Sequence, residues 1–249
     1  MTLIPKNHPR YLSLKIREQI SQGLKNGLVH ETGLIAHGRG EAFDYLIGET
    51  TIPFADQAIQ ATAASLLLAK KPVISINGNV AALSAKDCVI LAEAIPAKLE
   101  VNLFHRSPSR IKMIINALHA AGATEVYGLN GNARIPTLCH DRGICENDGI
   151  FSADIVLVPL EDGDRCIALK NMGKTVITID LNPLSRTAQT ADITIVDNII
   201  RAIPRMHEWI MKLKQIDKTN LLTILNKWDN RQNLQKVREF MAKRLNSLV

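Results

Sequence analysis

The amino-acid sequence contains no long hydrophobic run and few aromatic residues. Phe, Trp and Tyr make up 4% of the 249 residues, and no apolar segment approaches the roughly 20 residues that span a bilayer. The first ten residues, M-T-L-I-P-K-N-H-P-R, lack the apolar core of a secretory signal peptide. We therefore expect a cytoplasmic protein with no membrane partner.

Cysteine is also scarce, and its spacing excludes the common cysteine-based sites. Cys88, Cys139, Cys145 and Cys166 form no C-x-x-C pair, so the sequence predicts neither a zinc ribbon nor a thioredoxin-like redox site. Cys139 and His140 together with Cys145 could provide part of a metal site, although the spacing shows no fourth ligand. Separate, reduced thiols are the interpretation that we favour.

Most of the chain has no excess of positive charge. The excess is confined to the carboxyl-terminal end. Residues 205–249 hold ten Lys or Arg against four Asp or Glu, which accounts for the whole net charge of +6. The segments 212–228 and 237–245 are typical of amphipathic helices with basic outer faces. No aromatic-interleaved ribonucleoprotein pattern accompanies them, so a solvated helix face is favoured over an RNA-binding surface. We expect no nucleic-acid partner.

The composition is otherwise that of one globular α/β protein. A chain with 46% hydrophobic and 22% charged residues can bury a large core as a single domain over 1–249. We expect a helical part over 1–70, a parallel-sheet core over 72–204 and basic carboxyl-terminal helices over 205–249. Alternating β-branched and helical segments in the core predict a Rossmann-like, mostly parallel sheet flanked by helices.

The expected elements follow the hydrophobic periodicity of the chain. Helices are expected over 11–24 and 54–69, and a glycine-rich stretch, T-G-L-I-A-H-G-R-G over 32–40, is expected to let the backbone approach a ligand before a helix that begins near Glu41. An irregular polar stretch over 129–148 interrupts the core. The expected strands are 72–77, 99–104, 153–159, 175–180 and 192–197, with the short segment T-E-V-Y-G over 124–128 before the irregular stretch. The helices between them are 81–94, 110–121, 166–172 and one that begins near Asn198.

The motif D-L-N-P-L-S-R-T-A, residues 180–188, is the most informative part of the core. It follows the β-branched run 176–179, so Asp180 and Asn182 fall where a buried parallel strand opens into a loop. Ligands bind at that edge of open α/β sheets. Ser185, Arg186 and Thr187 supply hydroxyl and guanidinium donors for phosphate or ribose. An ordinary strand-to-helix connection with an Asn-Pro turn stays open as the alternative.

The other expected strands also end in polar side chains. Because the carboxyl ends of parallel strands lie on one edge, these residues can converge in one crevice. Several suit an anion, although structural salt bridges account for arginines equally well. Neither G-x-x-x-x-G-K-[ST] nor a strand followed by G-x-G-x-x-G is present, which excludes a Walker site and an ordinary Rossmann dinucleotide site. The residues are Asn77, Asn79, His105, Arg106, Glu161, Asp162, Asp164, Arg165, Asp197 and Asn198, with Arg17, Arg39, Arg110 and Arg186 as further cations.

The segment E-D-G-D-R, residues 161–165, could hold a magnesium ion that arrives with a nucleotide. Mg²⁺ uses one or two protein carboxylates and substrate phosphates, for which Asp162 or Asp164 would serve. A helix amino terminus that favours negative charge explains the same residues without a metal. The histidines that could act in acid–base chemistry, each more often structural when it stands alone, are His37, His105 and His140.

Seven blocks of the sequence occur in the order typical of one known family. They are H-P-R-Y-L-S-L (8–14), G-L-I-A-H-G-R-G-E-A-F-D-Y-L-I-G-E (33–49), P-V-I-S-I-N-G-N-V-A-A-L (72–83), E-V-N-L-F (100–104), V-P-L-E-D-G-D-R (158–165), I-D-L-N-P-L-S-R-T-A (179–188) and T-I-V-D-N (194–198). With these blocks the chain resembles the archaeal phosphopantothenate synthetases, the 4-phosphopantoate–β-alanine ligases. The resemblance covers about residues 8–206.

The resemblance implies an enzyme of coenzyme A biosynthesis. Its reaction joins (R)-4-phosphopantoate to β-alanine through a phosphopantoyl-adenylate, with ATP cleaved to AMP and diphosphate in the presence of Mg²⁺. A homodimer is implied as well, in which an arginine could act across the interface. Carried over position by position, the resemblance places ATP on Arg17, Arg39, Asp180, Leu181, Asn182, Arg186, Thr187, Asn198 and Ile199, of which Arg39 and Arg186 are expected at the triphosphate.

We assign other residues at the strand ends to the second substrate, phosphopantoate. Asn77, Asn79, Arg106 and His105 are expected to bind the phosphate and hydroxyl groups of phosphopantoate. The catalytic residues stay unassigned. The candidates for a base that takes a proton from the β-alanine amine are His37 and Glu161, and the candidate metal ligands are Asp162 and Asp164.

The chain departs from the family in one place, and two other functions compete with the ligase. Residues 166–169 read C-I-A-L where the family often has T-E-A-L, so no hydroxyl or carboxylate is available there for metal or nucleotide binding. The flanking motif is intact. A non-catalytic nucleotide-binding regulatory protein on the same fold and an RNA-binding protein that uses the basic end are the alternatives.

Overall fold

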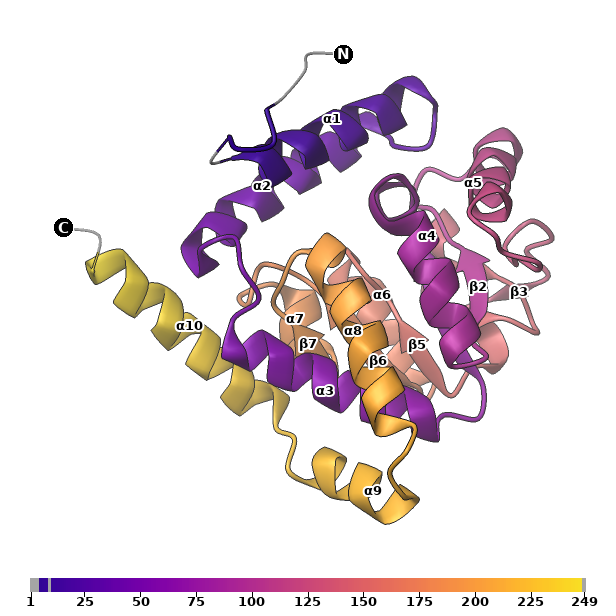
Figure 1. Ribbon diagram of the computed structural model, residues 1–249. Helices are drawn as coiled ribbons and strands as arrows, with labels where there is room; N and C mark the ends of the chain where they lie inside the picture. The colour runs from indigo at the N-terminus through magenta and orange to yellow at the C-terminus, as the bar shows by residue number, and fades with distance from the viewer. Residues whose placement is uncertain (1–4, 9, 248–249) are drawn as a thin grey trace.

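The computed structural model describes residues 5–8 and 10–247, and within them the core is a parallel sheet. The structure does not describe residues 1–4, which belong to the segment in which we expect no signal peptide, or Pro9 of the first family block. The strands of the sheet are β1 (Pro72–Ile76), β2 (Lys98–Val101), β5 (Ile155–Leu157), β6 (Thr175–Ile179) and β7 (Ile193–Ile195). Their order is β2-β1-β5-β6-β7, and every neighbouring pair is parallel (Figure 1).

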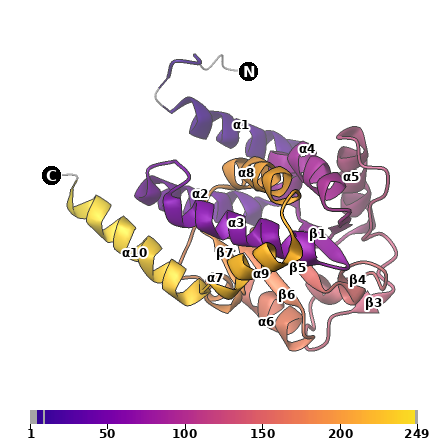
Figure 2. The same ribbon diagram turned by 60° about the horizontal axis from the view of Figure 1, so that its bottom comes forward.

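Helices cover both faces of this sheet, because its strands are apolar on both sides. Val73 faces a cluster with α6 (Gly163–Asn171), whereas Ile74 and Ile76 face the larger core. Figure 2 shows the two helical layers with the sheet between them. The predicted α/β fold is confirmed. The helices on the larger core are α3 (Pro53–Leu68), α4 (Gly78–Ala94), α5 (Pro108–Ala120) and α8 (Ile199–Leu213).

The amino-terminal part differs from the sequence expectation in one element. Residues 32–40 are not a loop, because α2 runs from Glu31 to Ile47 and includes all three of their glycines. The His30 side chain caps this helix by accepting a hydrogen bond from the Thr32 N–H, and Gly48 ends it in a left-handed conformation. Helix α1 (Tyr11–Lys25) lies beside α2, and together they project from the sheet (Figure 1).

The basic carboxyl-terminal helices are built into the core. The expected helix over 212–228 is interrupted, because α8 ends at Leu213 and Asp217 caps a separate helix, α9 (Lys218–Asn226). The last helix, α10 (Asn230–Asn246), buries three apolar side chains against α2, α3 and the segment after β6, so its basic residues lie on the outer face. These side chains are Leu234, Val237 and Met241.

The irregular stretch over 129–148 folds onto the edge of the sheet beside β2. It contains a small antiparallel pair, β3 (Ala133–Arg134) with β4 (Ile144–Cys145), and short 3-10 turns at Asp141–Gly143 and Ile150–Ser152 lie in and just after it. The buried Asn102 side chain, just past β2, donates hydrogen bonds to the backbone oxygens of Arg142 and Ile144 at 3.2 and 2.9 Å. A short helix, α7 (Arg186–Thr190), completes the fold. In the part of the chain that the structure describes, no helix is long and apolar enough to cross a bilayer.

Candidate active site

A cavity of about 640 Å³ lies between the carboxyl ends of the strands and helix α2. Residues that follow each of the five strands line it, so the strand ends converge on one crevice as a parallel sheet predicts. Helix α2 closes the cavity with residues that the sequence assigned to a loop. The predicted site residues that line it are His37, Arg39, Asn77, Asn79, His105, Glu161, Asp162, Asp180, Leu181, Asn182, Arg186, Thr187, Asn198 and Ile199.

Three of the predicted site residues lie outside the cavity lining. Arg17 on α1 pairs with Glu41 at 2.9 Å, and this hydrogen bond raises the pKa of the Arg17 guanidinium. The Arg106 side chain turns away from the cavity and donates to the Gly128 carbonyl oxygen at 2.6 Å. Asp164 pairs with Arg186 at the surface. The substrate role of Arg106 therefore has no geometric support in this chain.

The loop after β6 is held by its own side chains. The half-buried carboxylate of Asp180 accepts hydrogen bonds from the Asn182 N–H, at 2.9 Å, and from the Ser185 hydroxyl. Burial raises the pKa of Asp180, and the nearby charge of Arg39 on α2 opposes that rise. The Thr187 hydroxyl donates to the Glu161 backbone oxygen at 2.8 Å and so joins the loops after β5 and β6. Asp180 therefore builds the loop, and Arg186 remains at the cavity as a cation.

The polar side chains of the turn after β1 also form hydrogen bonds within the protein. The Asn77 side chain caps α4, because its oxygen accepts hydrogen bonds from the N–H groups of Asn79 and Val80. Its amide nitrogen donates to the backbone oxygens of Pro159 and Leu160, each at 3.1 Å. Asn79 donates to the Gly33 oxygen of α2 at 2.9 Å. Asn77 thus uses both ends of its amide within the protein and orders the cavity wall.

The end of β7 connects the sheet to α2. Asn198 caps α8 by accepting a hydrogen bond from the Ile200 N–H, and its amide nitrogen donates to Asp44 of α2 at 2.9 Å. Arg201 of α8 forms ion pairs with Asp44 and with the buried Asp197. These contacts fix α2 over the strand ends, so the groups that α2 brings to the cavity have a defined position.

A second group of cations lines the cavity near the end of β2. Its cations are Arg110 and Arg142, beside the His105 side chain, whose ring stacks on His30 with 3.8 Å between centroids. Burial, followed by the charges of His30, Arg110 and Arg142, lowers the pKa of His105. Sequence reasoning missed Arg142, which comes from the irregular stretch over 129–148. The length of that stretch was the available signal, because long irregular segments in compact domains are often functional.

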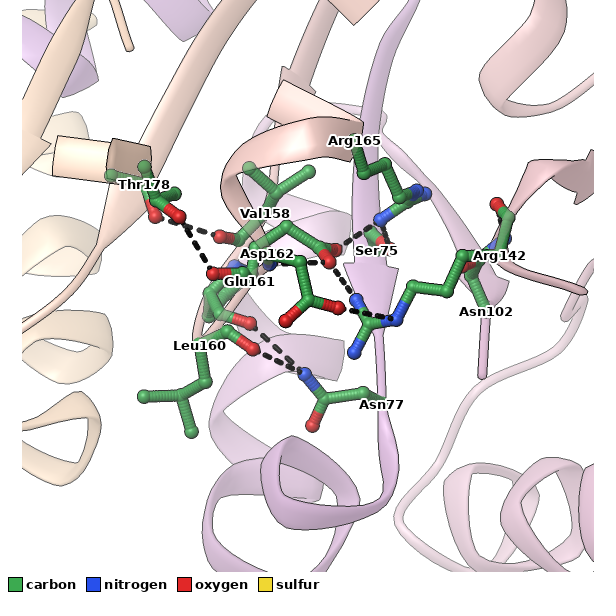
Figure 3. A network of polar contacts seen from close by, with 12 residues as sticks. Ser75, Asn77, Asn102, Arg142, Val158, Leu160, Glu161, Asp162, Arg165 and Thr178 are labelled. Atoms are coloured by element: carbon green, nitrogen blue, oxygen red, sulfur yellow. Dashed lines mark hydrogen bonds and ion pairs between the residues drawn. The ribbon is translucent and has the colours of Figure 1, made fainter. Parts of the chain in front are cut away.

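The two candidate bases have very different surroundings. Glu161, with a side chain that is 1% exposed, lies between Arg142 and Arg165 and accepts a further hydrogen bond from the Asp162 N–H at 2.8 Å (Figure 3). Its carboxylate is thus fully occupied. His37 is half-buried, lines the cavity, and has its pKa lowered by burial. His37 is therefore neutral at pH 7 and able to accept a proton.

Comparison with known proteins identifies the family. Residues 54–244 match the sequence model described as phosphopantothenate/pantothenate synthetase. Proteins named 4-phosphopantoate–β-alanine ligase are 53% identical in Thermococcus onnurineus (strain NA1), over all of this chain and 96% of the relative, and 52% identical in Methanosarcina mazei (strain Goe1), over 95% and 93%. The chain belongs to the phosphopantothenate/pantothenate synthetase family. The family match begins in α3, whereas the similarity to the Thermococcus onnurineus protein extends over the whole chain and so includes α2.

In this synthetase-family chain the departure at residues 166–169 lies away from the cavity. Cys166 is buried in the apolar cluster beneath α6, and neither it nor Ile167 lines the cavity. Burial raises the pKa of Cys88, Cys145 and Cys166 to about 12, and Cys139 is exposed. Within residues 5–8 and 10–247, no cluster of three His, Cys, Asp or Glu side chains could hold a metal by itself. The favoured interpretation of separate thiols agrees with this arrangement.

Proposed function

We propose that this synthetase-family chain joins 4-phosphopantoate to β-alanine with ATP, as the names of its relatives say of those proteins. The observation that carries the proposal is one cavity with two groups of cations. Arg39 and Arg186 lie near the end of β6, Arg110 lies near the end of β2, and the Arg142 guanidinium lies between these groups at Glu161, after β5. Three strand spacings of the sheet, or about 14 Å, separate the ends of β6 and β2. Such a cavity can hold two polyanions that react between the two groups.

The reaction that we propose has two steps. First, the phosphopantoate carboxylate attacks the α-phosphorus of ATP and displaces diphosphate, which leaves an acyl-adenylate. The β-alanine amine then attacks the acyl carbon, loses a proton and displaces AMP. Cations offset the charge that gathers when two anions meet, and a shared cavity supplies proximity. We propose ATP on the β6 and β7 side, at Arg39, Asp180, Leu181, Asn182, Arg186, Thr187, Asn198 and Ile199.

We propose His37 as the base for the β-alanine amine. It lines the cavity in a neutral state, whereas the Glu161 carboxylate is already bound by two arginines. An amine nucleophile must lose its proton, so a neutral imidazole suits the second step.

For Mg²⁺ we propose Asp162, whose side chain is 53% exposed and lines the cavity. Asp164 lies outside the cavity lining, where it pairs with Arg186 at the surface. Magnesium takes few protein carboxylates when phosphates complete its shell, so one carboxylate here is enough. When bound with ATP, the ion would neutralise phosphate charge.

We further propose a homodimer that is cytoplasmic and binds no nucleic acid. Exposed apolar side chains on α1 and α2, namely Leu12 at 58% and Ile35 at 74%, support a subunit contact there. The positive charges of α10 lie on the outer face of a helix that packs into the core, as on an ordinary solvated helix.

The test of the proposal is an assay with ATP, Mg²⁺, 4-phosphopantoate and β-alanine. We expect AMP, diphosphate and 4'-phosphopantothenate to form together. Binding of ATP by the folded protein without turnover would refute the ligase and favour the nucleotide-binding regulatory protein. Retention of RNA that falls steeply with salt and survives replacement of Arg39 would favour the RNA-binding alternative.

A further inference from the structure

A buried ionic network lies directly under the cavity, behind the end of β5. Arg142 and Arg165 each donate to one oxygen of the Glu161 carboxylate, and Arg165 also donates to the Ser75 hydroxyl at 3.2 Å (Figure 3). The side chains of Arg142, Glu161 and Arg165 are 9%, 1% and 0% exposed. Burial of guanidinium groups this deep is costly unless each charge is balanced.

The charge of this network is balanced in part by a carboxylate at the cavity surface. Arg142 and Arg165 share the Glu161 carboxylate, and burial together with their mutual repulsion lowers the pKa of Arg142 to about 10. The buried Glu100, whose pKa burial raises to about 7, offsets part of the Arg165 charge. Asp162 forms the second ion pair of Arg142, 3.5 Å from its Nε, and the Asp162 side chain is 53% exposed. The Arg142 guanidinium therefore faces the cavity beside a carboxylate that is half in solvent.

Arg142 also has donors to spare on the cavity side. Within the described residues its Nε has no hydrogen-bond acceptor, and neither do Nε and Nη2 of Arg165. Figure 3 shows the second terminal nitrogen of Arg142 pointing away from Glu161, toward the side of Asn77, which lines the cavity. A guanidinium that is held at one terminal nitrogen and free at the other can bind an anion.

We propose that Arg142 binds the phosphate group of the acyl substrate, and that Glu161 holds the guanidinium in place for it. The site takes a phosphate monoester. This inference rests on the proposed function, and it replaces Arg106, expected from the sequence, by a residue that the sequence did not indicate.

One observation favours this phosphate over the phosphates of ATP. The Arg142 guanidinium lies between Glu161, after β5, and the side chains of His105 and Arg110 near the end of β2, whereas the strand-end residues proposed for ATP follow β6 and β7. A phosphate monoester also carries close to two negative charges at neutral pH, so a guanidinium with a free donor suits it better than it suits a carboxylate. The carboxylate of the substrate is then free to meet ATP.

The experiment compares 4-phosphopantoate with unphosphorylated pantoate in the wild type and in Arg142→Gln. The variant leaves Arg165 and Glu161 as a balanced pair, so we expect it to fold, with circular dichroism and thermal melting as the check. Arg231→Gln, which changes an exposed arginine of α10, is the matched control. ATP affinity is measured separately by calorimetry.

We expect Arg142→Gln to lower kcat/KM for phosphopantoate roughly 10- to 100-fold, the loss of a charged hydrogen bond, with ATP affinity and pantoate turnover unchanged. Arg142→Lys keeps the buried charge but loses the paired donors, so we expect an intermediate kcat/KM for phosphopantoate. This variant replaces Arg142→Gln in the experiment if the Gln variant does not fold. A folded variant that keeps the wild-type preference for the phosphorylated substrate overturns the inference, as does a loss confined to ATP. A wild type that forms no AMP refutes the proposed function itself.

Discussion

At the scale of single residues, most polar side chains at the strand ends have a structural use. Asn77 caps α4 with one end of its amide and binds the next loop with the other, and Asp180 closes its own loop. Backbone groups at these turns would otherwise be buried without partners. The groups that remain for substrates are mainly cationic, which suits a reaction between anions.

The cations at the end of β6 give the first prediction. Arg186→Ala and Arg39→Ala are each expected to raise KM for ATP roughly 10-fold or more, because each removes a charged donor to phosphate. KM for phosphopantoate should stay near its wild-type value. Steady-state kinetics with each substrate varied in turn measures both. A change in the phosphopantoate KM alone would place the nucleotide elsewhere.

His37 gives a prediction about pH. Burial lowers its pKa below 6.5, so the imidazole is neutral at pH 7 and takes up a proton only on acidification. Ligation should therefore fall as pH drops through that lowered pKa. His37→Gln should remove this acid limb and reduce ligation roughly 100-fold or more, the usual contribution of a general base.

The first step supplies the control for His37. Exchange of labelled diphosphate into ATP, with phosphopantoate and without β-alanine, does not require the amine to lose a proton. This exchange should survive His37→Gln. If exchange and ligation fall together, His37 acts in binding or folding instead of as the base.

At the scale of elements, helix α2 is where sequence and structure diverge most. Its glycines led to the prediction of a loop, yet the segment is helical, with a cap at His30 and a hydrogen bond from Asn79 of α4 to the Gly33 oxygen. One of these glycines, Gly33, has a packing role, because a Cβ there would lie 2.4 Å from Asn79 Oδ1. The glycine thus allows α2 to approach α4 closely.

A matched pair of glycine substitutions tests this close approach. Gly33→Ala should destabilise the protein by about 1–3 kcal/mol through overpacking and should reduce activity by shifting His37 and Arg39. Gly38→Ala meets no atom within 4 Å and should stabilise the same helix by about 0.5–1 kcal/mol. Chemical denaturation measures both changes. Equal effects would show that spacing between α2 and α4 is unimportant.

At the scale of the whole molecule, a single subunit does not explain the expected contact of Arg17 with ATP. The family resemblance assigns Arg17 to ATP, but it lies outside the cavity lining, on α1, and pairs with Glu41. In a homodimer whose subunits meet through α1, Arg17 of one subunit would have access to the cavity of the other. The proposal of an arginine that acts across the interface therefore has a specific candidate.

Co-expression of two defective subunits tests this arrangement. Arg17→Ala and Arg186→Ala should each be weakly active alone. If Arg17 serves the partner's cavity, the mixed dimer contains one intact site, and random pairing should restore roughly a quarter of the wild-type activity per site. Separate purification of the tagged heterodimer confirms the pairing. Activity no higher than the mean of the two variants would place Arg17 within its own subunit.

The sequence by itself determined the parallel sheet, the edge at which its strands end, and the family. Continuous β-branched runs that alternate with helical segments leave few ways to bury the strands on both faces. The blocks after those strands are local, so they could be recognised along the chain. Family membership then followed from the same blocks, and the comparisons agree with it.

Only the tertiary structure decided which residues face the cavity. Residues 32–40 are helical and contact α4 through Gly33 and Asn79, and the position of Arg142 depends on an irregular segment that Asn102 holds against the sheet. Arg106, next to His105 in the sequence, turns away to bind a backbone oxygen. Side-chain direction and long-range contacts of this kind leave no periodic signal in the sequence, because they depend on partners far away in the chain.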